Sequence, residues 1–131
     1  MRLTLTWGLG IGVAIACVDL LAGEATRSVA DADLGAAIEL VDLLVNLALC
    51  GWVAFRVAAA LRELRPGLEA AVLAGLLAGC VGVGYQVARP SQPTTPENLV
   101  ALVAWNVVLA AAAGSLGAWA GSVRRPEPPA T

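Results

Sequence analysis

Four long apolar segments, separated by short polar stretches, make up almost the whole chain. Their extent predicts helices over residues 3–23, 34–61, 68–88 and 97–123. A helix of about 20 apolar residues is long enough to cross the hydrocarbon core of a bilayer. We therefore expect an all-α membrane protein, an antiparallel up-down bundle of four transmembrane helices. Residues 1–125 would form this single domain, and 126–131 a disordered cytoplasmic tail.

Capping residues and prolines mark where these helices begin and end. Asp33 follows the polar stretch 24–33 and is expected to cap the second helix. Residues 62–67 are predicted to form a tight turn, with Pro66 at the first position of the third helix. Thr95–Glu97 supplies a hydroxyl cap, a proline and an acid, which is a typical helix start.

The arginines predict how the bundle is oriented. Basic loops remain on the cytoplasmic side of a membrane protein. With four crossings, one side of the membrane receives Arg2, Arg56, Arg62, Arg65, Arg124 and Arg125. The other side receives only Arg27 and Arg89. We therefore expect both termini in the cytoplasm of a bacterium, with the chain in its inner membrane.

Composition supports a membrane location and excludes several function classes. Of 131 residues, 59% are hydrophobic and 14% charged, whereas soluble domains average roughly 45–50% apolar and about 25% charged. The chain has no His, which removes the commonest general base and the usual ligand of haem and zinc. No nucleophile stands beside a base, and no phosphate loop is present. We therefore expect no enzyme activity, cofactor or metal, and no nucleic-acid partner because the chain is acidic.

Small residues recur along one face of every predicted helix. Steps of three and four residues place small and polar side chains on a common stripe, with Trp105, Leu109, Leu116 and Trp119 turned away from it in the last helix. Helices in lipid associate by close backbone approach over small residues and by interhelical hydrogen bonds. The expected helix-packing residues are Gly8, Gly12, Gly75, Gly79, Gly117 and Gly121.

Polar residues on these stripes share one depth. At about 1.5 Å per residue they lie roughly 22–28 Å from the inner edge. That level is the outer third of a hydrocarbon core about 30 Å thick. These residues are Asp19, Asp42, Asn46, Gln86 and Asn106. They either hold helices together by hydrogen bonds, or line an acidic vestibule that attracts a small cation or shuttles a proton.

The three cysteines lie far apart within apolar segments and show no paired spacing. Cys17, Cys50 and Cys80 are expected to fill helix interfaces as small apolar residues. Residues 14–17, Ala-Ile-Ala-Cys, also have some likeness to a lipoprotein cleavage box, so lipidation of Cys17 stays open.

Two resemblances bear on function. Four short helices with an acid in the first resemble the small multidrug resistance transporters, in which a membrane-buried Glu exchanges protons for cationic drugs. Asp19 is the nearest match, but it is a different acid nearer the surface, and the aromatic and proline pattern of that family is missing. Residues 51–56, 66–67, 74–79 and 114–121 look like those of many small uncharacterised bacterial four-helix membrane proteins, which implies a membrane location and no chemistry.

These patterns lead to two hypotheses about function. The first is a structural or accessory membrane subunit, surrounded by the lipid bilayer and belonging to a homo-oligomer or a larger complex. The alternative is a small cation or proton-coupled transporter that uses the outer polar level. A dry, closed core would favour the subunit, and a water-accessible cavity at Asp19 and Asp42 would favour transport.

Overall fold

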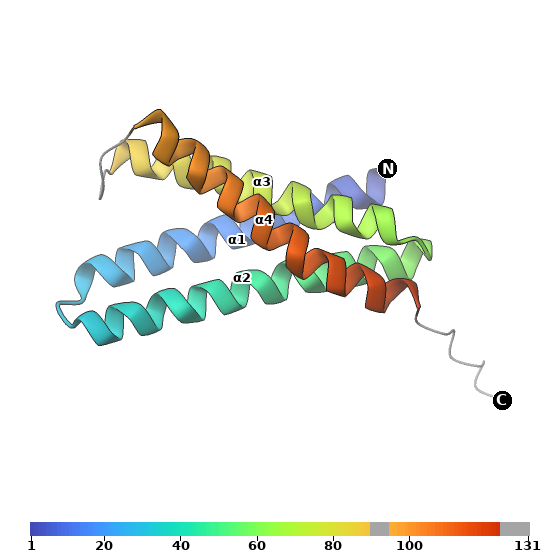
Figure 1. Cartoon of the computed structure of the whole chain (residues 1–131), viewed down its shortest axis with the longest axis horizontal. Helices are drawn as coiled ribbons and strands as arrows, with labels where there is room; N and C mark the ends of the chain where they lie inside the picture. Colours follow the sequence, from blue (N-terminus) through green and yellow to red (C-terminus); the bar gives the residue numbers. More distant parts are fainter. Residues whose placement is uncertain (90–94, 124–131) are drawn as a thin grey trace.

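The structure, a computed structural model, describes residues 1–89 and 95–123. Four helices account for nearly all of them: α1 (Arg2–Ser28), α2 (Ala32–Leu61), α3 (Leu64–Ala88) and α4 (Pro96–Ser122). Each is long and apolar enough to cross a membrane. They run up and down as a bundle (Figure 1), which confirms the predicted all-α architecture of four apolar helices and indicates a multi-pass protein embedded in a bilayer. The predicted tail 126–131 lies outside the described residues.

The helices form a four-membered bundle in which α1 and α4 lie diagonally. The first helix packs against α2 and α3, and α4 packs against the same two helices. Helices α2 and α3 also touch each other, and in the described part of the chain α1 makes no close approach to α4. At the end that holds the α1–α2 connection, the α1/α2 pair diverges from the α3/α4 pair (Figure 1). The N-terminus, the α2–α3 turn and the end of α4 lie at the opposite end.

The first helix is longer than its apolar segment predicts. It continues through Glu24 and Arg27 to Ser28, whose hydroxyl donates to the Ala25 carbonyl at 2.7 Å. Hydropathy marks where a chain leaves hydrocarbon, and a helix does not have to end at that level. The prediction that Asp33 caps α2 was wrong: Asp31 is the N-cap, and its Oδ1 accepts from the backbone N–H groups of Asp33 and Leu34 at 2.9 and 3.1 Å.

The α2–α3 turn is tighter than predicted. Arg62 ends α2 in the left-handed conformation (φ 57°, ψ 30°), and α3 begins at Leu64. Pro66 therefore lies inside the first turn of α3 and not at its first position. The proline fits there because the first N–H groups of a helix have no partner within the helix. At the start of α4, the predicted Thr95 cap and Pro96 at the first helical position are confirmed.

Burial divides the bundle into two halves of different character. We define the closed half as residues 2–16, 50–61, 64–79 and 110–122, and the open half as residues 17–28, 32–49, 80–88 and 96–109. Every buried residue that the structure describes lies in the closed half, with Gly35 the one exception. The largest fully buried side chains are Ile15, Val53 and Val57, and most of the other core residues are alanine or glycine.

The packing glycines of the closed half are distributed over three interfaces. Gly8 and Gly12 lie against α3, where an added Cβ would stand 2.9 Å from the Ala70 carbonyl oxygen and 3.1 Å from that of Ala74 respectively. Gly75 and Gly79 lie against Asn106 and Val103 of α4, and Gly117 and Gly121 lie against Gly51 and Phe55 of α2. Each small-residue pair therefore serves a different helix contact.

The outer face of α4 carries the large apolar side chains. Trp105, Leu116 and Trp119 are 58%, 73% and 62% exposed. Leu109 was predicted to share this face, but it is half-buried and lines a small cavity inside the bundle. At the N-terminal end, the rings of Trp7 and Trp52 meet edge to face at 5.3 Å, and the Arg56 guanidinium carbon lies 6.0 Å from each ring centre.

Candidate functional site: an acidic vestibule in the open half

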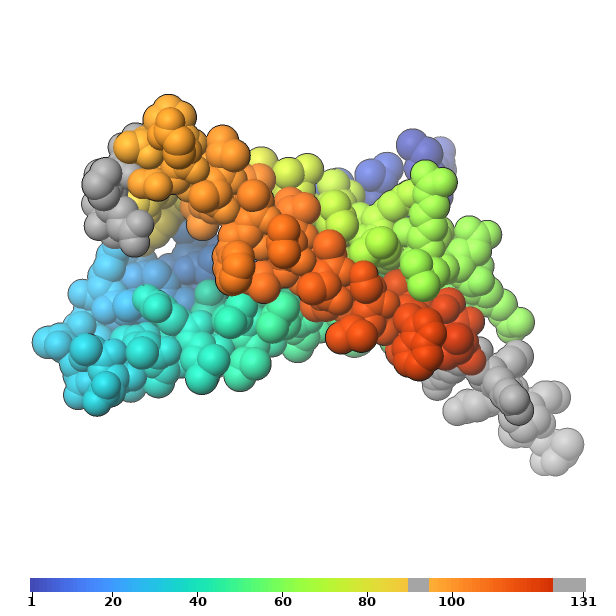
Figure 2. Space-filling view, viewed as in Figure 1, coloured from blue at the N-terminus to red at the C-terminus, as the bar shows by residue number. Residues whose placement is uncertain are grey.

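A polar pocket of about 500 Å³ lies where the two helix pairs diverge. Helices α1, α2 and α3 supply its walls, and the molecule is visibly hollowed there (Figure 2). We call this pocket the vestibule. Its lining residues are Asp19, Ala22, Gly23, Thr26, Arg27, Glu39, Asp42, Tyr85 and Gln86.

The innermost polar group of the vestibule is made up of Asp19, Asp42 and Asn46, which we call the trio. Asn46 donates from Nδ2 to Oδ1 of Asp19 at 2.5 Å, which joins α2 to α1. One helical turn away on α2, Asp42 lines the same pocket, and its carboxyl group lies near enough to that of Asp19 for the two to interact electrostatically. An ionised carboxylate only accepts hydrogen bonds, so a hydrogen bond between two carboxyl groups needs a proton on one of them. The trio is therefore a place where a proton can be held between two acids.

Two atoms of the vestibule walls have unmet hydrogen-bonding capacity. Oδ1 of Asp42 and Oγ1 of Thr26 are both buried and have no hydrogen-bond partner among residues 1–89 and 95–123. A buried polar atom without a partner is costly to the folded state. These two oxygens are acceptors that a bound cation or water would satisfy.

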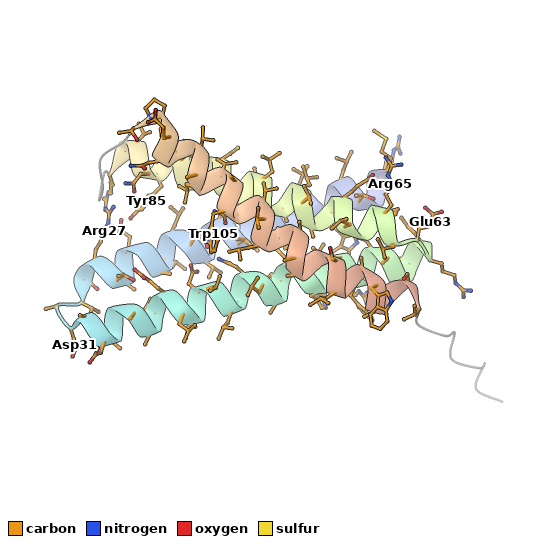
Figure 3. All side chains as sticks on the ribbon, in the orientation of Figure 1. Arg27, Asp31, Glu63, Arg65, Tyr85 and Trp105 are labelled. Carbon is orange, nitrogen blue, oxygen red and sulfur yellow. The ribbon has the colours of Figure 1, made fainter. Side chains whose placement is uncertain are left out.

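A cluster of four residues ties α1 to α3 at the mouth of the vestibule. Tyr85 donates its hydroxyl to Oε1 of Glu24 at 2.6 Å, and Arg89 donates from a guanidinium nitrogen to the same oxygen at 2.6 Å. Arg27 donates to the Arg89 carbonyl at 2.6 Å, and its guanidinium carbon lies 5.1 Å from the centre of the Tyr85 ring. We call Glu24, Arg27, Tyr85 and Arg89 the clasp; Figure 3 shows Arg27 and Tyr85 from the two sides of the opening.

Charge in the vestibule favours cations. Its walls carry three carboxyl groups, those of Asp19, Glu39 and Asp42, and one guanidinium, that of Arg27. The guanidinium lies at the mouth with the clasp, while Asp19 and Asp42 lie deeper. A concave site lined mainly by one sign of charge attracts ions of the opposite sign.

The structure brings four of the five predicted polar residues together and separates the fifth. Asp19, Asp42 and Gln86 line the vestibule, and Asn46 reaches it through its hydrogen bond to Asp19. Asn106 lies elsewhere: it donates to the Leu102 carbonyl of its own helix at 3.0 Å and lines a separate small cavity with Asn46. Equal depth along two helices does not place two side chains at the same site, because they also need to point in the same direction around the bundle.

The acidic side chains of the vestibule are not gathered into a cluster of three or more ligands in the described structure. Within the described ranges, no group of three or more His, Cys, Asp or Glu side chains is placed to hold a metal ion. All three cysteines are free thiols: Cys50 is buried, but Cys17 and Cys80 are exposed, so the prediction that they fill helix interfaces was wrong for these two.

The clasp is the part of the site that the sequence did not predict. The sequence predicts a polar connection over residues 24–33, and Arg27 and Arg89 enter the sequence predictions only through the orientation of the bundle. The available signal was spacing: Glu24 and Arg27 are three residues apart, and Tyr85 and Arg89 are four apart, so each pair shares a face if the helices continue that far. Because residues 24–28 are mostly polar, hydropathy alone did not predict that the first helix continues through them.

Comparisons of the chain with protein-family models, curated proteins and solved structures gave no match. What the protein does is therefore inferred from its own residues.

Proposed function

We propose that the protein binds a small monovalent cation in the vestibule and exchanges it for the proton held between Asp19 and Asp42. The observation that carries this proposal is that both carboxyl groups line the wall of one polar pocket of about 500 Å³. Ionisable groups inside membrane proteins are rare and tend to mark ion or proton pathways.

The exchange follows from charge balance. When the two acids share one proton they carry one negative charge, and loss of that proton leaves two. An entering monovalent cation restores the charge of the protonated pair, so cation entry and proton release favour each other. Oδ1 of Asp42 supplies an acceptor for the cation, since it lacks a partner in the described structure.

The vestibule opens at one end of the bundle, and the closed half seals the bundle at the other end. Below the trio, the closed half is filled by residues such as Val53, Ala54 and Ala74, all 0% exposed. A cation bound in this conformation therefore exchanges with one side only. Passage to the other side requires the glycine-lined contacts of the closed half to separate.

We further propose that the closed end faces the cytoplasm of a bacterium. Arg2, Arg56, Arg62 and Arg65 lie toward that end, and Arg27 and Arg89 lie at the vestibule mouth. Arg124 and Arg125, which fall outside the described residues, would add to the cytoplasmic count. The positive-inside rule then directs the vestibule to the outside of the inner membrane.

Proton release from proteoliposomes tests the exchange. A pH-sensitive dye enclosed with buffer would report proton movement when sodium, potassium or tetramethylammonium chloride is added outside. We expect at least one cation to drive proton exit, and Asp19→Asn and Asp42→Asn to abolish it. Asp33→Asn removes an exposed carboxylate at the same end of the bundle and should leave exchange intact. Failure of all three cations, or equal loss in Asp33→Asn, would contradict the proposal.

A second candidate function is that of a structural or accessory subunit. The observation in its favour is the exposed apolar stripe on α4, which includes Trp105, Leu116 and Trp119 and suits a partner helix as well as lipid. Purification from native membranes tests it. A partner retained by the natural chain and lost from Trp105→Ala plus Trp119→Ala would support the subunit; a chain purified alone would contradict it.

A further inference from the structure

A small cavity lies deeper in the bundle than the vestibule and shares no lining residue with it. Its volume is about 20 Å³, and its walls come from all four helices. Asn46 of α2 and Asn106 of α4 are its polar side chains, and Gly75 of α3 and Ile15 of α1 are among its apolar ones. The cavity is thus a polar site between helices that are otherwise packed through alanine and glycine.

The carboxamide oxygen of Asn46 has acceptor capacity to spare, and Asn106 uses its amide as a donor. Asn46 uses its Nδ2 for the hydrogen bond to Asp19, while its Oδ1 is buried and has no hydrogen-bond partner in the described structure. Asn106 uses its Nδ2 for the Leu102 carbonyl, which engages only the donor side of the amide. A molecule between the two side chains would therefore need to donate hydrogen bonds.

We infer that one water molecule occupies this cavity and donates its two protons to the carboxamide oxygens of Asn46 and Asn106. A single water needs at least roughly 10–15 Å³ of such space, so the cavity holds one water and has no room for two. The water also needs two or more polar partners, and the two asparagines provide them. An apolar cavity of this size would stay dry, but here an unpartnered buried oxygen forms part of the wall.

The water gives α4 a polar connection to the acidic trio. A line of hydrogen-bonding groups then runs from Asp42 through Asp19 and Asn46 to the water and Asn106. This line links α1 to α4, which make no close approach elsewhere in the described part of the chain. The inference stands on the cavity and its two asparagines, and it holds whether or not the vestibule exchanges cations.

Magnetic resonance on the full chain in liposomes of deuterated lipid tests the water directly. The chain has three asparagines, Asn46, Asn98 and Asn106, so isotopic labelling of asparagine side-chain nitrogen gives three signals. Asn98 lies exposed in the first turn of α4 and serves as the bulk-water reference. We expect polarisation to pass from water protons to the Asn106 side chain, with slower build-up than at Asn98.

Three variants separate a bridging water from other sources of signal. Asn46→Leu removes one partner, and the transfer to Asn106 should then fall to background. Ala110→Val keeps both asparagines but fills the cavity, so it should have the same effect. It can replace Asn46→Leu in the test if that variant fails to fold. Gln86→Leu changes the vestibule alone and should leave the signal unchanged. The inference is overturned if Asn106 receives no polarisation in the natural chain, or if its signal survives both cavity variants.

Discussion

The closed and open halves of the bundle are built from the same four helices, yet they are held together in different ways. On α1, Gly12 of the closed half is so near α3 that an added Cβ would lie 3.0 Å from Leu77, whereas at Gly23 of the open half it would find Tyr85 at an ordinary 3.7 Å. In the closed half, backbones approach over small residues, and packing contributes the cohesion. In the open half, a few hydrogen bonds and one ion pair join α1 to α3 where the α1/α2 pair stands apart from the α3/α4 pair.

The difference shows what a small-residue stripe can and cannot do. The approach is closest where both partners carry small residues, as where Gly117 lies against Gly51 and Gly114 against Ala71. Where a stripe meets long polar side chains, such as Tyr85 and Gln86, the helices separate and a pocket forms. One end of the protein can therefore be stable and sealed while the other remains accessible.

The largest expected effect comes from enlarging a glycine of the closed half. Gly75→Leu would place a Cβ 2.5 Å from that of Ala110 and 2.7 Å from the Asn106 carbonyl oxygen, so α4 has to move. We expect a loss of unfolding free energy of about 3 kcal/mol, at the upper end of overpacking costs. Reversible unfolding in bicelles or mixed micelles measures it.

Gly84→Leu is the matched control, since it changes a glycine of the same helix in the open half. A Cβ at Gly84 would meet nothing within 4 Å. We expect no loss of stability. Equal destabilisation by the two variants would remove the distinction between the halves.

Helical periodicity was enough to predict the helices and their small-residue faces. Gly8, Gly75 and Gly117 each have a second glycine four residues later, and the presence of such pairs on three helices indicates packing faces even in a chain rich in alanine and glycine. What periodicity leaves open is which helix each face meets. Gly8 contacts α3, whereas Gly117 contacts α2. These choices depend on how all four helices are arranged together.

The grouping of the polar residues was harder to predict. Two side chains meet only if they share both a depth in the membrane and a direction around the bundle, and the sequence gives only the depth. Asp19 and Asp42 meet, but Asn106 is turned toward a different cavity. Gly67 shows a related limit: it was assigned to a turn, yet it lies in α3 against the Ala54 carbonyl. Pro66, directly before Gly67, predicted that the helix starts there. The structure shows that α3 already begins at Leu64.

An intermediate effect is expected from the clasp. Glu24→Ala removes the acceptor of both the Tyr85 hydroxyl and the Arg89 guanidinium. We expect faster hydrogen–deuterium exchange in residues 17–28 and 80–88, because α1 and α3 lose their polar link at the mouth. Exchange in the closed half should stay unchanged.

An ion pair at the other end of α3 provides the control for the clasp. Arg65 and Glu69 pair at 2.7 Å within one helix, on exposed side chains. Glu69→Ala should alter exchange at neither end, since exposed pairs contribute little. If it loosens the bundle as much as Glu24→Ala does, the clasp has no special role.

The smallest effect is expected at the tryptophan pair. Arg56→Gln removes a guanidinium that lies 6.0 Å from the ring centres of Trp7 and Trp52. We expect a loss of about 0.5 kcal/mol, as for an exposed cation–π contact, together with a change in tryptophan fluorescence. Arg62→Gln, at the same end but outside this contact, should change neither quantity.

The most direct test of a sealed half beside a half with an open acidic pocket is chemical access to single cysteines. The background chain has its three cysteines replaced by alanine. Gly23→Cys and Gln86→Cys then place a single thiol in the vestibule. Ala74→Cys and Ala118→Cys place a single thiol in the fully buried core. We predict that a small cationic thiosulfonate modifies the vestibule thiols faster than its anionic analogue does, and that neither reagent reaches the core thiols. Equal modification in both halves, or vestibule thiols that react with neither reagent or without regard to charge, would contradict the account.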